Sequence, residues 1–237
     1  WQSTLTEVES GLIHGPLTPT EIAARVGPRW VAARRFGIRQ GEKIRPIDNF
    51  AEFGVNDAFG SSEKVALLSV DHIVSWSRAR LECCDEDRKV RLLDNAGTEW
   101  NGKLHESWSI EDWRSIQGRV ADLQNAYKQL AVHPSCQSFS VIAAQDPSSG
   151  IVKLFEAWAL MFGETAAVYG FLRISRALSM IASRIFDLMI VEFFDDFTQV
   201  ENSALTESAL ETMEGMADSI LTFTNFLHLV RGEVIIA

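Results

Sequence analysis

The chain is organised around the segment Leu188-Met189-Ile190-Val191-Glu192-Phe193-Phe194-Asp195-Asp196-Phe197-Thr198-Gln199-Val200. Two adjacent carboxylates, Asp195 and Asp196, lie here between runs of β-branched and aromatic residues. Such runs are typical of strands, so the pattern predicts two strands joined at the acidic pair. Two neighbouring anions are costly without a counter-charge, which a divalent cation would supply. An acidic hairpin tip on a solvated surface would have the same sequence.

The composition is that of an ordinary globular protein. Of 237 residues, 46% are hydrophobic and 23% are charged, which allows one large domain or two interleaved ones. No apolar run reaches the roughly 18–20 residues of a membrane span, so we expect no membrane partner. The cysteines and histidines show no metal-ligand or disulfide spacing. The chain starts at Trp1 and not at Met, which favours a piece of a longer polyprotein.

Charge is unevenly distributed. The net charge is −10, which argues against nonspecific attraction of the whole chain to nucleic acid. Residues 25–45 nevertheless hold seven basic residues and a single acidic one, whereas residues 191–220 hold eight acidic residues and no basic one. An enzyme that handles a polyanion with the help of a metal could use this polarity, and a solvated surface could also produce it.

Local patterns predict alternating hairpins and helices. Thr18-Pro19-Thr20-Glu21 is a helix start, and Gly27-Pro28 is a stop. The order of elements indicates an α+β fold with an antiparallel sheet that carries acids at its edge. Further expected elements are hairpins over 34–48, 138–158 and 188–200, helices over 61–82, 163–186 and 203–221 (with Leu205, Leu210, Met213, Met216 and Ile220 inward), a strand and helical turn over 118–130, and a last strand over 232–236.

Asp122 ends one of the expected strands, far in sequence from the acidic pair. If the strands are neighbours, three carboxylates meet at one place. Carboxylate oxygens without nearby lysines suit two hard divalent cations. Two such ions can clamp the attacking and leaving oxygens of a phosphoryl transfer.

Four segments resemble, in the same order, the motifs of reverse transcriptases from retrotransposon-type elements. The ordered set is more specific than any single segment. The segments are Lys43-Ile44-Arg45-Pro46-Ile47-Asp48 (fingers hairpin, with Asn56 after it), Asp122-Leu123-Gln124-Asn125-Ala126-Tyr127 continuing to His133-Pro134 (first palm motif), Leu160-Met161-Phe162-Gly163 with Ala166-Ala167-Val168 and Phe171-x-Arg173 (second motif), and Phe193-Phe194-Asp195-Asp196 (third motif).

The resemblance implies that Asp122, Asp195 and Asp196 are catalytic and bind two Mg²⁺ or Mn²⁺ ions, with Asp196 in a supporting role. Tyr127 would lie under the incoming sugar and exclude a 2′-hydroxyl, so that the product would be DNA. Its alternative is a core tyrosine beside a strand.

The same resemblance assigns nucleotide contacts. Lys43 and Arg45 would hold the triphosphate, and a solvated hairpin is their alternative. Phe162 and Gly163 would border the nucleotide pocket, and a plain helix start is the alternative. Arg173 would face the template or merely solvent.

The implied architecture is a right-hand polymerase palm, an antiparallel sheet with helices on one face, plus fingers and without a thumb. Residues 1–96 would be mostly fingers, including the basic hairpin 34–48. Residues 97–237 would be palm, with an interleaved fingers hairpin at 132–157 and a truncated C-terminal end. The partners would be a primed RNA or DNA template and deoxynucleoside triphosphates.

Two other interpretations stay open. Met161 and Glu164 depart from the family's second motif, and the thumb is missing, so the chain could be a catalytically inactive retroelement remnant that binds nucleic acid or protein. Alternatively, an unrelated acidic domain that binds Ca²⁺ or Mg²⁺ predicts that Asp122 lies far from Asp195. A separation above about 8 Å would favour it, because paired metal sites hold ions about 3.5–4 Å apart.

Overall fold

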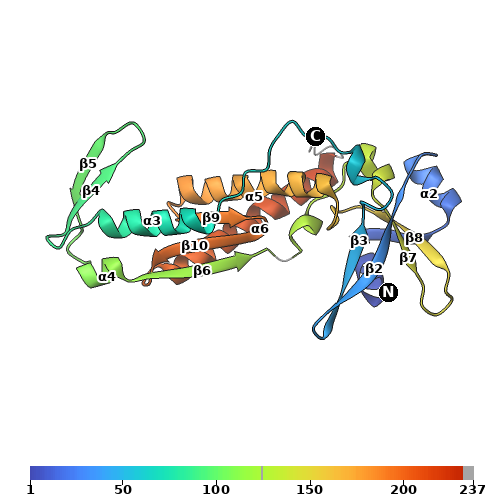
Figure 1. Ribbon diagram of the computed structural model, residues 1–237, viewed down its shortest axis with the longest axis horizontal. Coiled ribbons are helices and arrows are strands. Elements are labelled where there is room, and N and C mark those ends of the chain that lie inside the picture. The colour runs from blue at the N-terminus through green and yellow to red at the C-terminus, as the bar shows by residue number, and fades with distance from the viewer. Residues whose placement is uncertain (124, 232–237) are drawn as a thin grey trace. The chain divides into compact units, whose positions relative to one another are not determined.

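The computed structural model describes residues 1–123 and 125–231 and shows an α+β protein (Figure 1). The chain forms two compact units. Unit 1 comprises residues 1–65, 124–173 and 220–237, and unit 2 comprises residues 66–123 and 174–219. Each unit is therefore assembled from segments that are distant in sequence.

Unit 1 is built on a five-stranded sheet of order β1-β8-β7-β2-β3. All neighbours are antiparallel except β2 and β7, which are parallel. The hairpin β7–β8 thus lies in the same sheet as the basic hairpin β2–β3. The strands are β1 (Ile13–Leu17), β2 (Ala32–Gln40), β3 (Lys43–Asn49), β7 (Val141–Gln145) and β8 (Val152–Ala157).

Both faces of this sheet are covered over part of their area. Because neighbouring side chains of a strand point to opposite faces, Val141 and Ile142 enter two different clusters. Ile142 packs with Phe155 and, from helix α1 (Gln2–Glu9), Val8. On the other side, helix α2 (Pro19–Val26) contributes Ile22, which is fully buried. Short 3-10 turns at Asn56–Ala58, Ala126–Gln129 and Pro134–Phe139 complete the unit.

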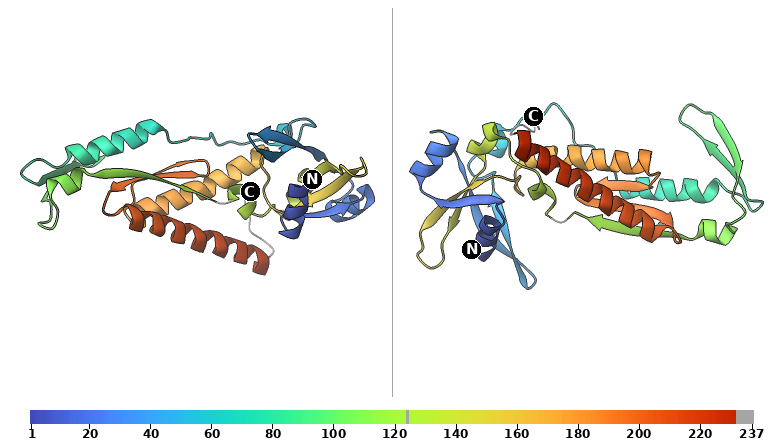
Figure 2. Two further views of the ribbon diagram at one scale, coloured as in Figure 1. Left: turned by 90° about the horizontal axis from the view of Figure 1, so that it is seen from below. Right: turned by 180° about the vertical axis from the view of Figure 1, so that it is seen from behind.

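Unit 2 contains a three-stranded antiparallel sheet of order β6-β10-β9. The first part of helix α6 (Thr206–Arg231), residues 206–219, lies along one face of it, as the view from behind shows (Figure 2). The Gln199 side chain donates a hydrogen bond of 3.1 Å to the carbonyl of Ala209, and Arg119 forms an ion pair with Glu207. The strands are β6 (Ile116–Asp122), β9 (Ile190–Phe193) and β10 (Asp196–Asn202), and the separate ribbon consists of β4 (Lys89–Leu93) and β5 (Glu99–Lys103).

The remaining helices are α3 (Val70–Glu82), α4 (Ile110–Arg114) and α5 (Thr165–Ile185). One face of helix α5 is buried, since Leu178 and Ala182 on it have no exposed surface. Within the described chain, no helix has the length and apolar character needed to cross a membrane.

Most local predictions are confirmed. The start of α2 is a full capping box, in which Thr18 accepts from the Glu21 amide and the Glu21 side chain accepts from Thr18. The turns expected at Gln40-Gly41, within 146–150 and at the acidic pair all join antiparallel strands. The strand expected over 232–236 lies outside the described residues.

The bounds of two helices were predicted wrongly. The helix expected from residue 61 begins only at Val70, because the Ser69 hydroxyl caps the Asp71 amide and stops the helix from extending backwards. The helix expected over 203–221 begins at Thr206 and continues to Arg231. Leu205 lies before it and is 40% exposed, while Ala209 and Ala217 are buried beside the expected Met213 and Met216.

Candidate carboxylate site

The turn between β9 and β10 consists of Phe194 and Asp195. Phe194 has a φ of 57°, in the left-handed region that a bulky residue rarely adopts. Such a conformation costs on the order of 1–3 kcal/mol and is held only by its surroundings. Here the buried Ser175 of α5 donates a hydrogen bond of 2.7 Å to the Phe194 carbonyl. The acidic pair is therefore held in a defined, strained turn.

The antiparallel register of β6 and β10 brings the third carboxylate to this turn. Asp122 is directly opposite Asp196, and the Leu123 amide approaches the Asp195 carbonyl at 3.5 Å. Opposed Cα atoms in such a ladder are about 4.5–5.5 Å apart, and their side chains share one face. Both aspartates are exposed on that face. The interpretation that separates Asp122 from the acidic pair is thus disfavoured.

Asp195 is partly buried beside these charges. Burial raises the pKa of Asp195, and the negative charges of Asp196 and Asp122 raise it further, against a backbone hydrogen bond that lowers it. A raised carboxyl pKa next to two other carboxylates is the electrostatic signature of a site that lacks positive charge.

Within the described part of the chain, no arginine, lysine or histidine forms an ion pair with these three aspartates. Among the same described residues, no group of three or more histidine, cysteine, aspartate or glutamate side chains is arranged to hold a metal ion. The donor chemistry, three hard carboxylates, fits a divalent cation. To bind such a cation, the three aspartate side chains would have to rotate toward a common point.

The side of the sheet that carries Asp122 and Asp196 also carries apolar side chains. Val120 and Phe193, on the same side of the sheet as Asp122 and Asp196, are 58% and 49% exposed. On the opposite side, Glu192 is buried with its Oε2 atom unpaired. Glu192 and Ser175 were not predicted as site residues, because neither burial nor a contact across the fold is visible in the sequence.

In unit 1, Tyr127, Phe162 and Gly163 come together. The Tyr127 ring is 4.7 Å from the Phe162 ring and 4.7 Å from the Phe171 ring, measured between centroids. Tyr127 is buried, whereas Phe162 is 44% exposed. Gly163 has a φ of +97°, and a β-carbon there would come within 2.4 Å of the Asp48 carbonyl oxygen. Only glycine fits this position.

Asn56 anchors the segment that follows Gly163. Its side-chain amide donates to the Gly163 carbonyl at 3.0 Å and accepts from the Thr165 amide at 2.9 Å. Arg173, expected to face template or solvent, forms an ion pair with Glu63 at 3.0 Å. This pair is exposed at the surface of unit 1.

Lys43 and Arg45 lie on one face of β3, near the end of the β2–β3 hairpin. Both are exposed, and within the described residues neither forms an ion pair. Arg45 is opposite Ile38, which is 47% exposed. This face of the hairpin therefore presents the two cations Lys43 and Arg45 beside the partly exposed Ile38.

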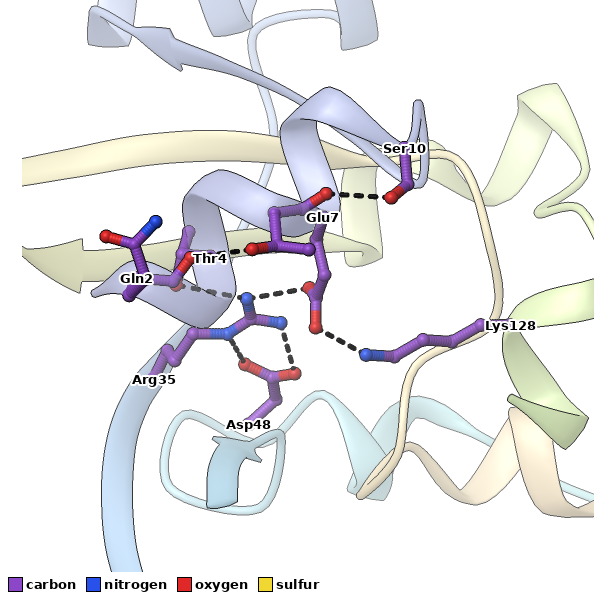
Figure 3. A network of polar contacts seen from close by, with 8 residues as sticks. Gln2, Thr4, Glu7, Ser10, Arg35, Asp48 and Lys128 are labelled. Atoms are coloured by element: carbon purple, nitrogen blue, oxygen red, sulfur yellow. Dashed lines mark hydrogen bonds and ion pairs between the residues drawn. The ribbon is translucent and has the colours of Figure 1, made fainter. Parts of the chain in front are cut away.

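Arg35, one of the seven basic residues in the segment 25–45, is buried in an ion network (Figure 3). Its guanidinium donates to both carboxylate oxygens of Asp48, at 2.7 and 2.9 Å, and to Glu7 at 2.8 Å. Lys128 also pairs with Glu7. Burial lowers the pKa of Arg35, but Asp48 and Glu7 raise it overall. The network links α1, β2 and β3 to the residue after Tyr127.

No protein-family model matches this sequence, and no curated protein is significantly similar to it. The resemblance to reverse transcriptases therefore rests on the four ordered segments alone.

Proposed function

We propose that the chain is the fingers and palm of a reverse-transcriptase-like polymerase, which adds deoxynucleotides to a primer 3′ end on an RNA or DNA template. The observation that carries this proposal is the pairing of β6 with β10, which sets Asp122 opposite Asp196 and beside Asp195. The exposed face and the lack of a paired cation among the described residues suit a metal-dependent carboxylate site, and strained turns of this kind are common at active sites.

In this proposal Asp122 and Asp195 hold two Mg²⁺ or Mn²⁺ ions, and Asp196 supports them. Bound ions of this kind stabilise the charge that develops on the attacking and leaving oxygens of phosphoryl transfer. The protein's own contribution is to keep the three carboxylates adjacent and unneutralised. Ser175 helps by holding the turn from α5.

The nucleotide contacts would come from unit 1. Lys43 and Arg45 are exposed and available for phosphate oxygens. Tyr127 is wedged between Phe162 and Phe171, so its ring cannot move aside for a 2′-hydroxyl without displacing one of them. Gly163 lets the backbone beside Phe162 pack closely against β3, since any side chain there would collide with the Asp48 carbonyl.

Primer extension tests the activity. We expect incorporation on a primed template with Mg²⁺ or Mn²⁺, and a loss of about a hundredfold or more in Asp122→Asn and Asp195→Asn, as for other electrostatic transition-state contacts. Asp218→Asn, which removes an exposed carboxylate from α6 in the same unit, is the matched control and should behave as the unsubstituted chain. Folded protein without incorporation would refute the catalytic proposal.

A second candidate is the inactive remnant that binds nucleic acid or protein. It is favoured by the observation that no described group of three side chains is arranged to hold a metal, and by the presence of Glu164 next to Gly163. It predicts salt-dependent binding of a primed template through the basic hairpin with no incorporation. It also predicts that Asp122→Asn leaves that binding unchanged, whereas Lys43→Gln weakens it.

A further inference from the structure

A small pocket in unit 1 has a buried carboxylate in its wall. The cavity has a volume of about 180 Å³ and lies between the 55–59 turn, the 3-10 turn Pro134–Phe139 and the start of α5. Glu164 lines it, is only 7% exposed, and its Oε2 atom has no hydrogen-bond partner. An isolated buried carboxylate oxygen is costly, so this position calls for a partner.

None of the residues that the structure describes supplies that partner. Asn56, a polar side chain of the lining, uses its amide nitrogen and oxygen on Gly163 and Thr165. The lining contains one other titratable group, the Cys136 thiol, and no cation. Burial raises the pKa of Glu164 to about 7, which fits a carboxylate without a counter-charge.

The other residues that line the pocket determine which kind of ligand fits it. Val55, Phe59 and Phe139 present apolar and aromatic surface. A water cluster is unsuited, because each buried water needs about 2–4 polar partners. A hard metal ion is also unsuited, because it needs about six oxygen ligands or more and the wall offers one carboxylate. Aromatic faces and a carboxylate together attract a positive charge with an apolar body.

We propose that this pocket binds a small organic cation, with its apolar body against Val55, Phe59 and Phe139 and its ammonium or amidinium group paired with Glu164. The cavity is smaller than the roughly 300–1,000 Å³ of drug-sized sites, so the ligand is the size of a single substituted ring. The inference is independent of the catalytic proposal, since none of the lining residues is a proposed metal ligand or nucleotide contact.

The test compares two probes of the same shape, benzylammonium and the neutral benzyl alcohol. Methyl resonances of Val55, Ala58 and Ala166 are followed by NMR while each probe is added to the whole chain at pH 8. We expect saturable shifts with benzylammonium at a Kd about tenfold or more below that of benzyl alcohol, as a charge-assisted contact predicts. Lowering the pH to 6 should weaken benzylammonium binding, because Glu164 is then protonated.

Two variants and one control make the result decisive. Glu164→Gln keeps the shape and should reduce the preference for benzylammonium to less than about threefold. Ala166→Leu keeps the carboxylate, fills the cavity and should abolish binding of both probes. Glu9→Gln, an exposed carboxylate of the same unit, should change nothing. No binding by the unsubstituted chain, equal Kd values for the two probes, or an unchanged preference in Glu164→Gln would each overturn the proposal.

Discussion

Asp122 and Asp196 face each other across the β6–β10 ladder with no described cation paired to either. Like charges directly opposite destabilise a sheet by roughly 0.2–1 kcal/mol. We therefore expect Asp122→Asn to raise the free energy of unfolding by about that amount in metal-free buffer, measured by urea denaturation. Saturating Mn²⁺ should stabilise the unsubstituted chain and not the variant. Asp218→Asn is the control, and Mn²⁺ should stabilise it as it stabilises the unsubstituted chain. Stabilisation of Asp122→Asn by Mn²⁺ as well would show that the ion binds elsewhere.

Gly163 should not tolerate a side chain. In Gly163→Ala the new methyl group would meet the Asp48 carbonyl oxygen at 2.4 Å, and the φ of +97° would itself be strained. We expect a loss of about 2 kcal/mol or more in the free energy of unfolding. Gly60→Ala, where a β-carbon meets nothing within 4 Å, is the control and should cost far less. Similar values for the two substitutions would contradict the close approach.

Glu164 should make the protein less stable as the pH rises. Its pKa is about 7 in the folded chain against 4.5 ordinarily, so the folded state binds more protons between these values. The protonated Glu164 side chain makes its full contribution to the free energy of unfolding below pH 4.5. This contribution declines as the pH rises above 4.5 and is lost once the pH passes about 7. A shift from 4.5 to about 7 corresponds to about 3 kcal/mol in order of magnitude.

Glu164→Gln removes this titration. At pH 8 we expect the variant to be more stable than the unsubstituted chain, and at pH 4 we expect the two to be nearly equal. Thermal unfolding across this pH range measures the difference. Glu9→Gln, in which an exposed carboxylate is lost, should run parallel to the unsubstituted chain. If the stability of Glu164→Gln also followed that of the unsubstituted chain across this pH range, Glu164 would have an ordinary pKa.

Arg35 should be far more important for stability than its neighbour Arg34. Arg35→Met leaves the buried carboxylates of Asp48 and Glu7 without their shared cation, which costs about 3–5 kcal/mol. Arg34 is an exposed cation on the same strand that pairs with Glu52, and Arg34→Met should cost about 1 kcal/mol or less. Urea denaturation of the two variants provides the comparison, and equal losses would contradict the buried network.

Helix starts and strand positions are determined mainly by short stretches of sequence. The helix start at Thr18-Pro19-Thr20-Glu21 and the strands around Asp195 and Asp196 depend on neighbours within a few residues, and both were predicted correctly. The start of α3 was missed although its signal is also local. The cap is Ser69, which leaves residues 61–69 outside the helix.

The sequence by itself determined the three hairpins over 34–48, 138–158 and 188–200, most helices and the presence of acidic residues at the ends of two strands, because propensity and periodicity act over a few residues. The β4–β5 hairpin was not predicted. Only the tertiary structure decided that Asp122 is opposite Asp196, that Arg35 is buried with Asp48 and Glu7, and that Glu164 lines a pocket without a partner. Register and burial depend on contacts between distant segments, and a residue's type does not reveal which neighbours folding will bring to it.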